Sequence, residues 1–340
     1  ELIMAEYKNI KGTTVQSLAS DPPTTQLGQV WYNTTSSAYK SIVGAAAWAT
    51  GGTMVTPSAG SMGGAGTQTS AVVMATGAGP TSSYEYDGAS WTTSPGTLNT
   101  GRTIGSGGGA SNTAAIYCGG FSGPPAYASL TAVEEYNGST WSTNPTSLNT
   151  ARKGQAGAGA TSEAVWVAGG VTHPPSPGTN LNATETFDGS TWTTSPGVLN
   201  TARQYMAAAG TVTAAVVAGG QVPPPYSTYN NTELWDGSTW TNGNVLNQTR
   251  KFPRGNGSQT AAAAYGGNSA PPASIYNNTE LFDGTSWANS VTMTTARVEF
   301  GSAVQAPQMT ALACGGETPS ATDATEELGL VNTVETITTS

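Results

Sequence analysis

A unit of 43 to 51 residues recurs along this chain of 340 residues, measured between corresponding tryptophans of each copy from Trp48 to Trp287. Each copy has an apolar run that ends in glycines, a variable proline-rich loop, and an aromatic residue followed by Asp-Gly or Asn-Gly. A tryptophan follows four or five residues after that aromatic. Residues 184–220 contain the unit in full, so the repeat has to be interpreted before any single residue.

The pattern inside the unit predicts short β-strands joined by tight turns. Proline or glycine interrupts every window long enough for a helix, and no stretch has a sustained 3.6-residue period. Asp-Gly suits a tight hairpin, because glycine adopts positive φ without steric cost. Repeats of about 40–50 residues with several short strands are typical of propeller blades. The sequence therefore predicts an all-β protein, a β-propeller of four-stranded antiparallel blades.

The unit resembles the kelch repeat, in which a basic residue opens the first strand, Gly-Gly ends the second, an aromatic ends the third and tryptophan lies in the fourth. The recurring basic residues are Arg102, Arg152, Arg203, Arg250 and Arg297. The recurring tryptophans are Trp91, Trp141, Trp192, Trp240 and Trp287. The resemblance covers about residues 28–340 and implies a kelch-like propeller, without implying a particular activity.

Two blade counts, six and seven, are compatible with the sequence. Six glycine-ended runs pair with six following hairpins, the last over residues 325–338, and the strands around Trp31, Tyr39 and Trp48 are left over. These N-terminal strands either form a seventh blade closed by a C-terminal strand or dock onto a ring of six. We favour seven, because joining the two ends removes exposed strand edges. The predicted domains are an N-terminal attachment segment or leader, 1–26, and the propeller, 27–340.

More narrowly, the chain is similar to kelch-like proteins of marine tailed bacteriophages. The similarity lies in MAEYKNIKG from Met4, DPPTTQLGQVWYNTTSSAYKS from Asp21, the NGSTW and LNTAR motifs, and the ending TEELGLVNTVETITTS. It implies a tail-fibre or virion structural protein, present in multiple copies and attached to other virion proteins through its N-terminal segment. We expect a non-enzymatic virion protein whose propeller adheres to a host-cell glycan or receptor. The alternatives are a purely structural decoration or connector, and a glycan-active propeller enzyme.

Charge and hydropathy exclude several kinds of partner. Only 9% of the residues are charged, the net charge is −9 and the pI is about 4.5, so nucleic acid and anionic membranes are repelled. No apolar run reaches roughly 18 residues and no secretory signal pattern is present. We therefore expect no membrane insertion and no signal peptide. The resemblance to phage proteins implies a location on the outer surface of the tail or capsid. Cys118 and Cys314 occupy equivalent places in different copies, which predicts buried thiols rather than a disulfide.

The chain offers little for catalysis or metal binding, since His173 is its one histidine. Glutamates stand two residues before the aromatic in four copies: Glu134, Glu185, Glu233 and Glu280. A catalytic pair would be unique to one blade, whereas these glutamates and the arginines recur. We interpret them as ion pairs that fasten blade to blade. The alternative is a ring of arginines at one mouth of the central channel that binds an anion or a sialic-type carboxylate. We expect no catalytic residue, no metal site and no cofactor.

The loops between the second and third strands vary most between copies. Proline stiffens them, and rigid loops with tyrosine, asparagine and serine are typical of adaptable recognition surfaces. The candidate ligand-binding residues are Phe121, Tyr127, His173, Tyr226, Tyr229 and Tyr276. They suit a sugar, whose ring faces stack on tyrosine and whose hydroxyls bond to amides. The alternative is a set of solvated loops, or loops that pack against a neighbouring virion subunit.

Overall fold

The computed structural model describes residues 15–22, 27–58, 60–75, 81–174, 178–222, 227–269 and 274–337. Within these residues every regular element is a β-strand and no helix is present. The chain divides into two compact units, one formed by Glu1–Ala47 with Leu330–Ser340 and the other by Trp48–Gly329. The second unit thus begins at Trp48.

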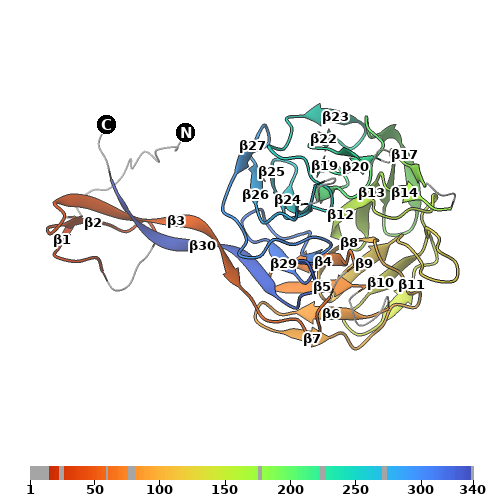
Figure 1. Ribbon diagram of the computed structural model, residues 1–340, viewed down its shortest axis with the longest axis horizontal. Helices are drawn as coiled ribbons and strands as arrows, with labels where there is room; N and C mark the ends of the chain where they lie inside the picture. The colour runs from red at the N-terminus through yellow and green to blue at the C-terminus, as the bar shows by residue number, and fades with distance from the viewer. Residues whose placement is uncertain are drawn as a thin grey trace. The chain divides into compact units, whose positions relative to one another are not determined.

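Five four-stranded antiparallel sheets follow one another along the second unit (Figure 1). The first sheet contains β4 (Gly63–Thr67), β5 (Ser70–Met74), β6 (Ser83–Tyr86) and β7 (Trp91–Thr93). The second contains β8 (Ser106–Ser111), β9 (Ala114–Cys118), β10 (Val133–Tyr136) and β11 (Trp141–Thr143). The third contains β12 (Ala156–Thr161), β13 (Ala164–Ala168), β16 (Ala183–Phe187) and β17 (Trp192–Val198). The fourth contains β18 (Ala207–Thr211), β19 (Ala214–Ala218), β22 (Thr232–Trp235) and β23 (Trp240–Gly243). The fifth contains β24 (Arg254–Ser258), β25 (Ala261–Tyr265), β26 (Thr279–Phe282) and β27 (Trp287–Asn289).

The sixth sheet combines the two ends of the chain. Its strands are β28 (Gly301–Ser302), β29 (Leu312–Cys314), β30 (Thr325–Thr336), β3 (Ala38–Thr50), β2 (Val30–Asn33) and β1 (Gln16–Leu18), in that spatial order. β1 runs parallel to β2, whereas β2 and β3, and β28, β29 and β30, pair antiparallel. Two short hairpins lie outside these sheets: β14 (Val171–Thr172) with β15 (Thr179–Asn180), and β20 (Gln221–Val222) with β21 (Ser227–Thr228).

The prediction of a C-terminal hairpin over residues 325–338 is wrong. Thr325–Thr336 form one continuous strand, and β3 occupies the place beside it. The local reason is visible in the sequence, because no Asp-Gly turn and no tryptophan follow Thr325. Trp48, which lies in β3, stands where the tryptophan of this sheet would otherwise be. The N-terminal strands therefore belong to the same sheet as β28, β29 and β30.

The turns between third and fourth strands are built by the residue that precedes glycine. Oδ1 of Asp188 accepts hydrogen bonds from the backbone N–H groups of Thr191 at 2.8 Å and Ser190 at 2.9 Å, and Gly189 has a φ of +91°. The bond from Thr191, followed by that from Ser190, lowers the pKa of Asp188 to about 2. Asn137 accepts the same two bonds in the second sheet, so the turn tolerates either residue.

The first strand of each sheet lies innermost. β4, β8, β12, β18, β24 and β28 each contact the next, and β28 contacts β4 (Figure 1). Glycine permits the close approach: a Cβ on Gly64 would overlap the carbonyl oxygen of Ser302, and one on Gly107 would overlap the carbonyl oxygen of Gly64. The glycine-rich inner strands are thus a packing requirement of the hub.

The recurring tryptophans pack between neighbouring sheets and are only 5–7% exposed. Each lies over the aromatic residue that ends the third strand of its own sheet, with ring centroids 4.7–5.3 Å apart. In most cases the indole N–H also donates to a serine or threonine of the preceding sheet, at 2.8–3.1 Å. These pairs are Trp48–Thr279, Trp91–Thr325, Trp141–Ser83, Trp240–Thr184 and Trp287–Thr232.

Trp192 departs from this arrangement. Its indole N–H is buried and has no hydrogen-bond partner among the residues that the structure describes. The position equivalent to the serine or threonine is occupied by Val133, which packs in the same buried cluster. Neighbouring sheets are therefore fastened by indole hydrogen bonds everywhere except between the second and third.

Candidate functional site

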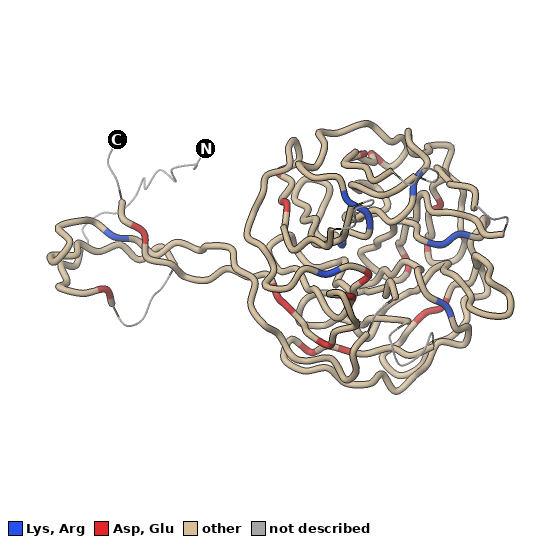
Figure 2. The backbone as a smooth tube through the Cα atoms, in the orientation of Figure 1, with Lys and Arg blue, Asp and Glu red and all other residues tan. Residues whose placement is uncertain are grey.

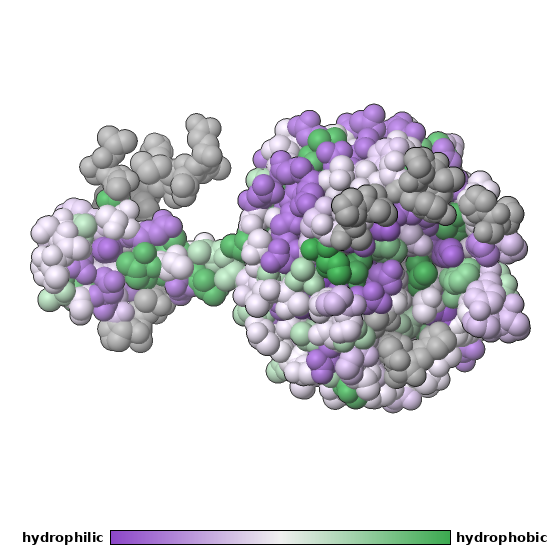
Figure 3. Space-filling view, viewed as in Figure 1, coloured by the Kyte–Doolittle hydropathy of each residue, from purple (hydrophilic) through white to green (hydrophobic). Residues whose placement is uncertain are grey.

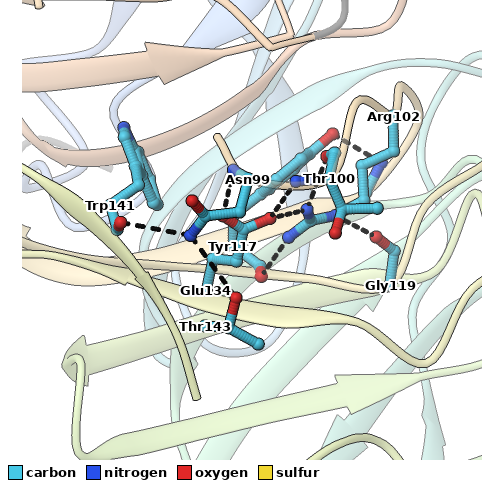
Figure 4. Close-up of polar contacts among 9 residues, drawn as sticks. Asn99, Thr100, Arg102, Tyr117, Gly119, Glu134, Trp141 and Thr143 are labelled. Atoms are coloured by element: carbon cyan, nitrogen blue, oxygen red, sulfur yellow. Dashed lines mark hydrogen bonds and ion pairs between the residues drawn. The ribbon is translucent and has the colours of Figure 1, made fainter. Parts of the chain in front are cut away.

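The five recurring arginines are all completely buried, and each forms an ion pair with a buried glutamate. The pairs are Arg102–Glu134, Arg152–Glu185, Arg203–Glu233, Arg250–Glu280 and Arg297–Glu326. The guanidinium groups also donate to backbone carbonyls, as Arg102 does to Gly119 at 2.8 Å and Tyr117 at 2.9 Å (Figure 4). Their hydrogen-bonding capacity is therefore directed into the protein.

Each glutamate also holds the linker that enters its sheet. Glu134 accepts from the backbone N–H groups of Asn99 at 2.6 Å and Thr100 at 3.1 Å, and the amide of Asn99 reaches the carbonyl of Trp141 at 3.2 Å (Figure 4). Arg102 precedes β8 and Glu134 lies in β10, so both belong to the second sheet and its entering linker. The prediction that these ion pairs fasten one blade to the next is therefore wrong. Each pair anchors a linker to the sheet that the linker enters.

Sequence reasoning missed one partner and one substitution in this set. Glu326 pairs with Arg297 at 2.7 Å, and Thr325-Glu326 repeats the Thr-Glu of Thr232-Glu233. In the first sheet Tyr84 takes the place of the glutamate, and its hydroxyl lies 2.7 Å from Oγ1 of Thr56. A neutral hydroxyl pair thus replaces the ion pair where the chain lacks the arginine.

Three of the predicted loop residues lie together. Phe121 and Tyr127 come from the loop between β9 and β10, and His173 from the loop between β13 and β16. The ring of Phe121 lies 5.6 Å from that of His173 and 6.4 Å from that of Tyr127, between centroids. Nδ1 of His173 lies 2.7 Å from the carbonyl oxygen of Tyr127, so Nδ1 carries the proton. Nζ of Lys153 lies 3.5 Å from the centre of the Phe121 ring.

This aromatic cluster, defined by Phe121, Tyr127, His173 and Lys153, joins two neighbouring sheets. The backbone N–H of His173 donates to Oγ of Ser129 at 2.9 Å, which fixes one loop to the other. Tyr127 is 52% exposed, so the cluster presents an aromatic ring to solvent. Burial lowers the pKa of Lys153, whose ammonium group lies over an aromatic face. The cluster therefore combines a stacking surface with a positive charge.

The other predicted loop residues do not join this cluster. Tyr229 and Tyr276 occupy equivalent places in the fourth and fifth sheets, where the backbone N–H donates to a glycine carbonyl and the carbonyl accepts from the arginine of the next linker. Both side chains are half-buried, and the ring of Tyr276 lies 5.7 Å from the guanidinium of Arg250. Tyr226 lies outside the described residues.

A ring of backbone hydrogen bonds lies where the linkers meet the axis. Six linker residues form it, each with φ between 50° and 64°, and we refer to them as the mouth ring: Ser61, Ile104, Gly154, Tyr205, Phe252 and Glu299. Around most of the ring, each N–H donates to the carbonyl of the preceding member, at 2.7–3.2 Å. Positive φ is unusual for a β-branched residue such as Ile104, and backbone of this kind often marks a functional site.

The mouth ring opens on the same face as the aromatic cluster, which we call the loop face. Linker residue Thr103 pairs with Phe121 by a β-bridge, and Lys153 pairs with Val171 in the same way. The side chains of Tyr205 and Phe252 stack with centroids 3.9 Å apart. In Figure 3 hydrophobic side chains gather near the middle of the second unit, and in Figure 2 its basic residues lie toward the interior rather than the rim. The stacked rings of Tyr205 and Phe252 thus place aromatic side chains at the mouth ring.

Below the mouth ring the inner strands enclose an axial cavity of about 40 Å³, which adjoins a hollow of about 20 Å³ at the mouth. Arg254, Gln155 and Met206 line both spaces. None of the five recurring arginines lines the cavity or the hollow. The alternative in which these arginines form a ring at the channel mouth is therefore wrong. Their side chains turn into the sheets, and a sixth arginine with no counterpart in other copies takes the axial place.

Arg254 reaches across the axis from the fifth sheet. Its Nε donates to the carbonyl of Phe300 at 2.5 Å and its Nη2 to the carbonyl of Met62 at 2.9 Å. No carboxylate lies within ion-pair distance of it in the described part of the chain. Burial lowers its pKa, and Glu299 at the mouth acts on it only at longer range. The sequence carried a signal for this residue, because the other copies have glycine, serine or alanine at this position.

Glu299 is the acidic member of the mouth ring. Burial, followed by repulsion from Glu317, raises its pKa. Elsewhere, Cys118 and Cys314 are free and buried, and burial raises the pKa of Cys314 to about 12. Among the described residues no group of three His, Cys, Asp or Glu side chains could hold a metal ion. Those residues also contain no helix long and apolar enough to span a bilayer.

Comparison with known proteins identifies the fold only. No protein-family model matches the chain, and no curated protein matches its sequence. Its structure is similar to that of YjhT, which has a β-propeller-type fold, with a TM-score of 0.66 and 15% sequence identity. The match covers 84% of this chain and 99% of YjhT. The fold is propeller-like. The predicted all-β class with four-stranded antiparallel sheets is confirmed, and identity this low carries no argument about function.

Proposed function

We propose that this protein is a non-enzymatic component of a bacteriophage virion whose kelch-like propeller adheres to a host-surface glycan through the loop face. The observation that carries the proposal is the aromatic cluster. Two loops from different sheets place Phe121 and His173 edge to face and leave Tyr127 exposed beside them. Aromatic surfaces flanked by a few polar groups suit sugar rings, because the apolar face stacks and the hydroxyls find hydrogen bonds.

We infer that the propeller has six blades, the sixth completed by the N-terminal strand β3. The support is the sixth indole hydrogen bond, from Trp48 to Oγ1 of Thr279 at 2.9 Å, which repeats the contact of the other tryptophans. The contact of β28 with β4 is further support. Joining the two ends of the chain in one sheet leaves fewer open strand edges. On this proposal the six-bladed alternative replaces the seven blades that we favoured from the repeat alone.

The first unit is the proposed attachment to other virion proteins. Among the described residues, large hydrophobic side chains that are exposed concentrate in this small unit: Val15, Leu27, Tyr39, Leu330, Val331, Val334 and Ile337. The second unit, several times longer, exposes only Val55, Tyr127, Val198 and Val245. Exposed apolar groups that gather in one place are typical of interaction surfaces. A purely structural connector would use the same surface, so this feature supports the virion assignment more than it supports adhesion.

The glycan-active enzyme receives less support from the same residues. That alternative required a ring of arginines and glutamates open to substrate. Each of these side chains is at most 4% exposed and is paired with its partner inside the protein. Recurrence from sheet to sheet, together with linker hydrogen bonds, favours a structural role for the set.

The adhesion proposal is tested by retention of the purified protein on host cells and on a glycan array. We expect the double variant Phe121→Ala/Tyr127→Ala to lose retention by at least about 10-fold, because aromatic anchors commonly dominate such interfaces. Val198→Ala is the matched control, since Val198 is 42% exposed on the outer strand β17. Equal retention of the double variant and the wild type would remove the aromatic cluster from the proposal. No retention of the wild type on any host surface would leave the connector as the better function.

The attachment proposal has a separate test in assembled particles. We expect Leu330→Ser/Val334→Ser to reduce incorporation into particles, because both side chains are exposed in the first unit, at 58% and 37%. Val245→Ser, at a site 49% exposed in the second unit, is the control. Normal incorporation of the double variant, scored by quantitative immunoblot of purified particles, would contradict attachment through this surface.

A further inference from the structure

We propose that the axial cavity binds a carboxylate group through Arg254. The argument begins with what sets this arginine apart. The five recurring arginines are each neutralised by a glutamate, whereas Arg254 has no acidic partner within ion-pair distance in the part of the chain described. Arg254 is half-buried. A cation partly withdrawn from water without a counter-ion is unfavourable, so an anion that enters the cavity gains a favourable interaction.

The guanidinium is held in a fixed orientation before any ligand arrives. Nε donates to the carbonyl of Phe300, and Nη2 donates to the carbonyl of Met62, which lie in the linkers just before β28 and β4. The ring of Phe300 lies 5.9 Å from the guanidinium carbon. Nη1 makes no hydrogen bond to any described residue, and the side chain lines the cavity. A planar donor fixed at two of its nitrogens can present the third to a ligand with little loss of entropy.

The cavity has the size and the polar lining that a carboxylate requires. Its volume of about 40 Å³ exceeds the roughly 10–15 Å³ needed by one water molecule, so a group with two oxygens can enter. Gln155 is 6% exposed and also lines the cavity. Its Nε2 donates to the carbonyl of Cys118 at 2.8 Å and to Oγ of Ser106 at 3.2 Å. Its Oε1 is buried and has no partner in the described part of the chain. This acceptor suits a hydroxyl carried next to the carboxylate, or a water that bridges the two.

Glu299 is a carboxylate that acts on Arg254 at longer range without lining either space. It lies in the mouth ring, and burial together with Glu317 raises its pKa. The negative charge of Glu299 repels the carboxylate of an incoming ligand. Removing that charge by Glu299→Gln should therefore strengthen ligand binding. The opposite result is expected if Arg254 and Glu299 are simply a structural pair, because Glu299→Gln would then leave the guanidinium less stable.

The test is titration of the full chain with sodium acetate and with sodium glucuronate, followed by calorimetry and by thermal unfolding. We expect saturable binding that Arg254→Met weakens by at least about 10-fold, the equivalent of one charge-assisted hydrogen bond. Lys251→Met is the matched control, because Lys251 is a nearby cation that does not line the cavity. Glu299→Gln should increase affinity by a few-fold. Equal affinity in the wild type and Arg254→Met would overturn the proposal.

Two further measurements keep the proposal testable if Arg254→Met does not fold. A competition experiment then identifies the source of the carboxylate. Gln155→Glu places a carboxylate beside Arg254, and it should abolish acetate binding while the protein stays folded. In crystals soaked with bromoacetate, the anomalous bromine signal should lie at the axial cavity; a signal elsewhere only, or none, would overturn the proposal. Acetate binding without glucuronate competition would identify a small free carboxylate as the ligand. Competition by glucuronate, but not by glucose, would identify an acidic sugar that enters from the loop face.

Discussion

The unpaired indole of Trp192 provides a sharp test of how neighbouring sheets are fastened. Five tryptophans donate to a serine or threonine of the preceding sheet, and Trp192 faces Val133 instead. Valine and threonine have nearly the same shape. Val133→Thr therefore places a hydroxyl where the repeat already has one, and we expect the variant to be more stable than the wild type.

The magnitude follows from the hydrogen bond that is restored. A buried donor without a partner costs about 1–3 kcal/mol, and a typical internal hydrogen bond contributes about 0.5–1.5 kcal/mol net of desolvation. Burying the new hydroxyl offsets part of the gain, since Val133 is only 1% exposed. We expect a gain of about 1 kcal/mol in the free energy of unfolding. For a unit of roughly 280 residues, that corresponds to a rise in Tm of about 2 °C.

Guanidinium denaturation of four proteins measures the effect: the wild type, Val133→Thr, Trp192→Phe and the double variant. Phenylalanine keeps an aromatic ring but removes the N–H donor. If the gain comes from the indole hydrogen bond, the Val133→Thr change stabilises the wild type and not the Trp192→Phe background, with a coupling of about 1 kcal/mol. A gain that persists without the indole, or a Val133→Thr variant less stable than the wild type, would refute the reasoning.

Three further predictions concern the linker ion pairs, the hub and the turns. Arg152→Met should lower the free energy of unfolding by about 3–5 kcal/mol, because Glu185 is left buried without a counter-ion. The double variant Arg152→Met/Glu185→Met should lose less stability in denaturant titrations. A larger loss in the double variant would argue against this account. Gly64→Ala should abolish folding or lower the free energy of unfolding by more than about 3 kcal/mol, because its Cβ would overlap backbone atoms. Gly123→Ala is the control: a Cβ there has no atom within 4 Å, so the free energy of unfolding should change by under about 0.5 kcal/mol. Circular dichroism measures both variants. The folded pKa of Asp188 is depressed to about 2, so its stabilising contribution is present above the unfolded value of 3.8 and disappears as the pH falls through about 2. Asp188→Asn should therefore reduce the acid sensitivity of unfolding in that interval, and an unchanged acid-unfolding profile would exclude this turn as a source of it.

Much of the architecture could be predicted from the repeat, because it depends on local chemistry. The Asp188 turn, the glycine-ended second strands and the aromatic–tryptophan pair lie within one copy, and the sequence spacing already places them in neighbouring strands. The recurring glutamates were interpreted as structural because catalytic residues need not recur, and burial with arginine agrees with that interpretation. Glu326 was missed because the last copy lacks the aromatic and the Asp-Gly turn that mark the others.

The candidate site was less accessible to sequence reasoning. The loops were selected because they vary, and the structure brings Phe121 and His173 together while it leaves Tyr229 and Tyr276 in backbone-anchoring positions. Arg254 was passed over because its neighbour Arg250 matched the repeat. The repeat shows that Arg254 has no counterpart in the other copies, but it does not show that Arg254 lacks an acidic partner, since the partner of Arg250 comes from a strand about 30 residues away.

The sequence by itself determined the strands, the turns, the glycine-rich hub and the buried arginine–glutamate–tryptophan pattern, since each recurs at short range and is selected by local backbone and packing chemistry. Only the tertiary structure decided that β3 lies beside β30, that two loops form one aromatic cluster, and that Arg254 stands unpaired on the axis. These features depend on contacts between residues far apart in the chain, such as Trp48 and Thr279, which are 231 positions apart. Such contacts form only when the sheets come together, and the periodicity of the repeat does not encode which copy meets which.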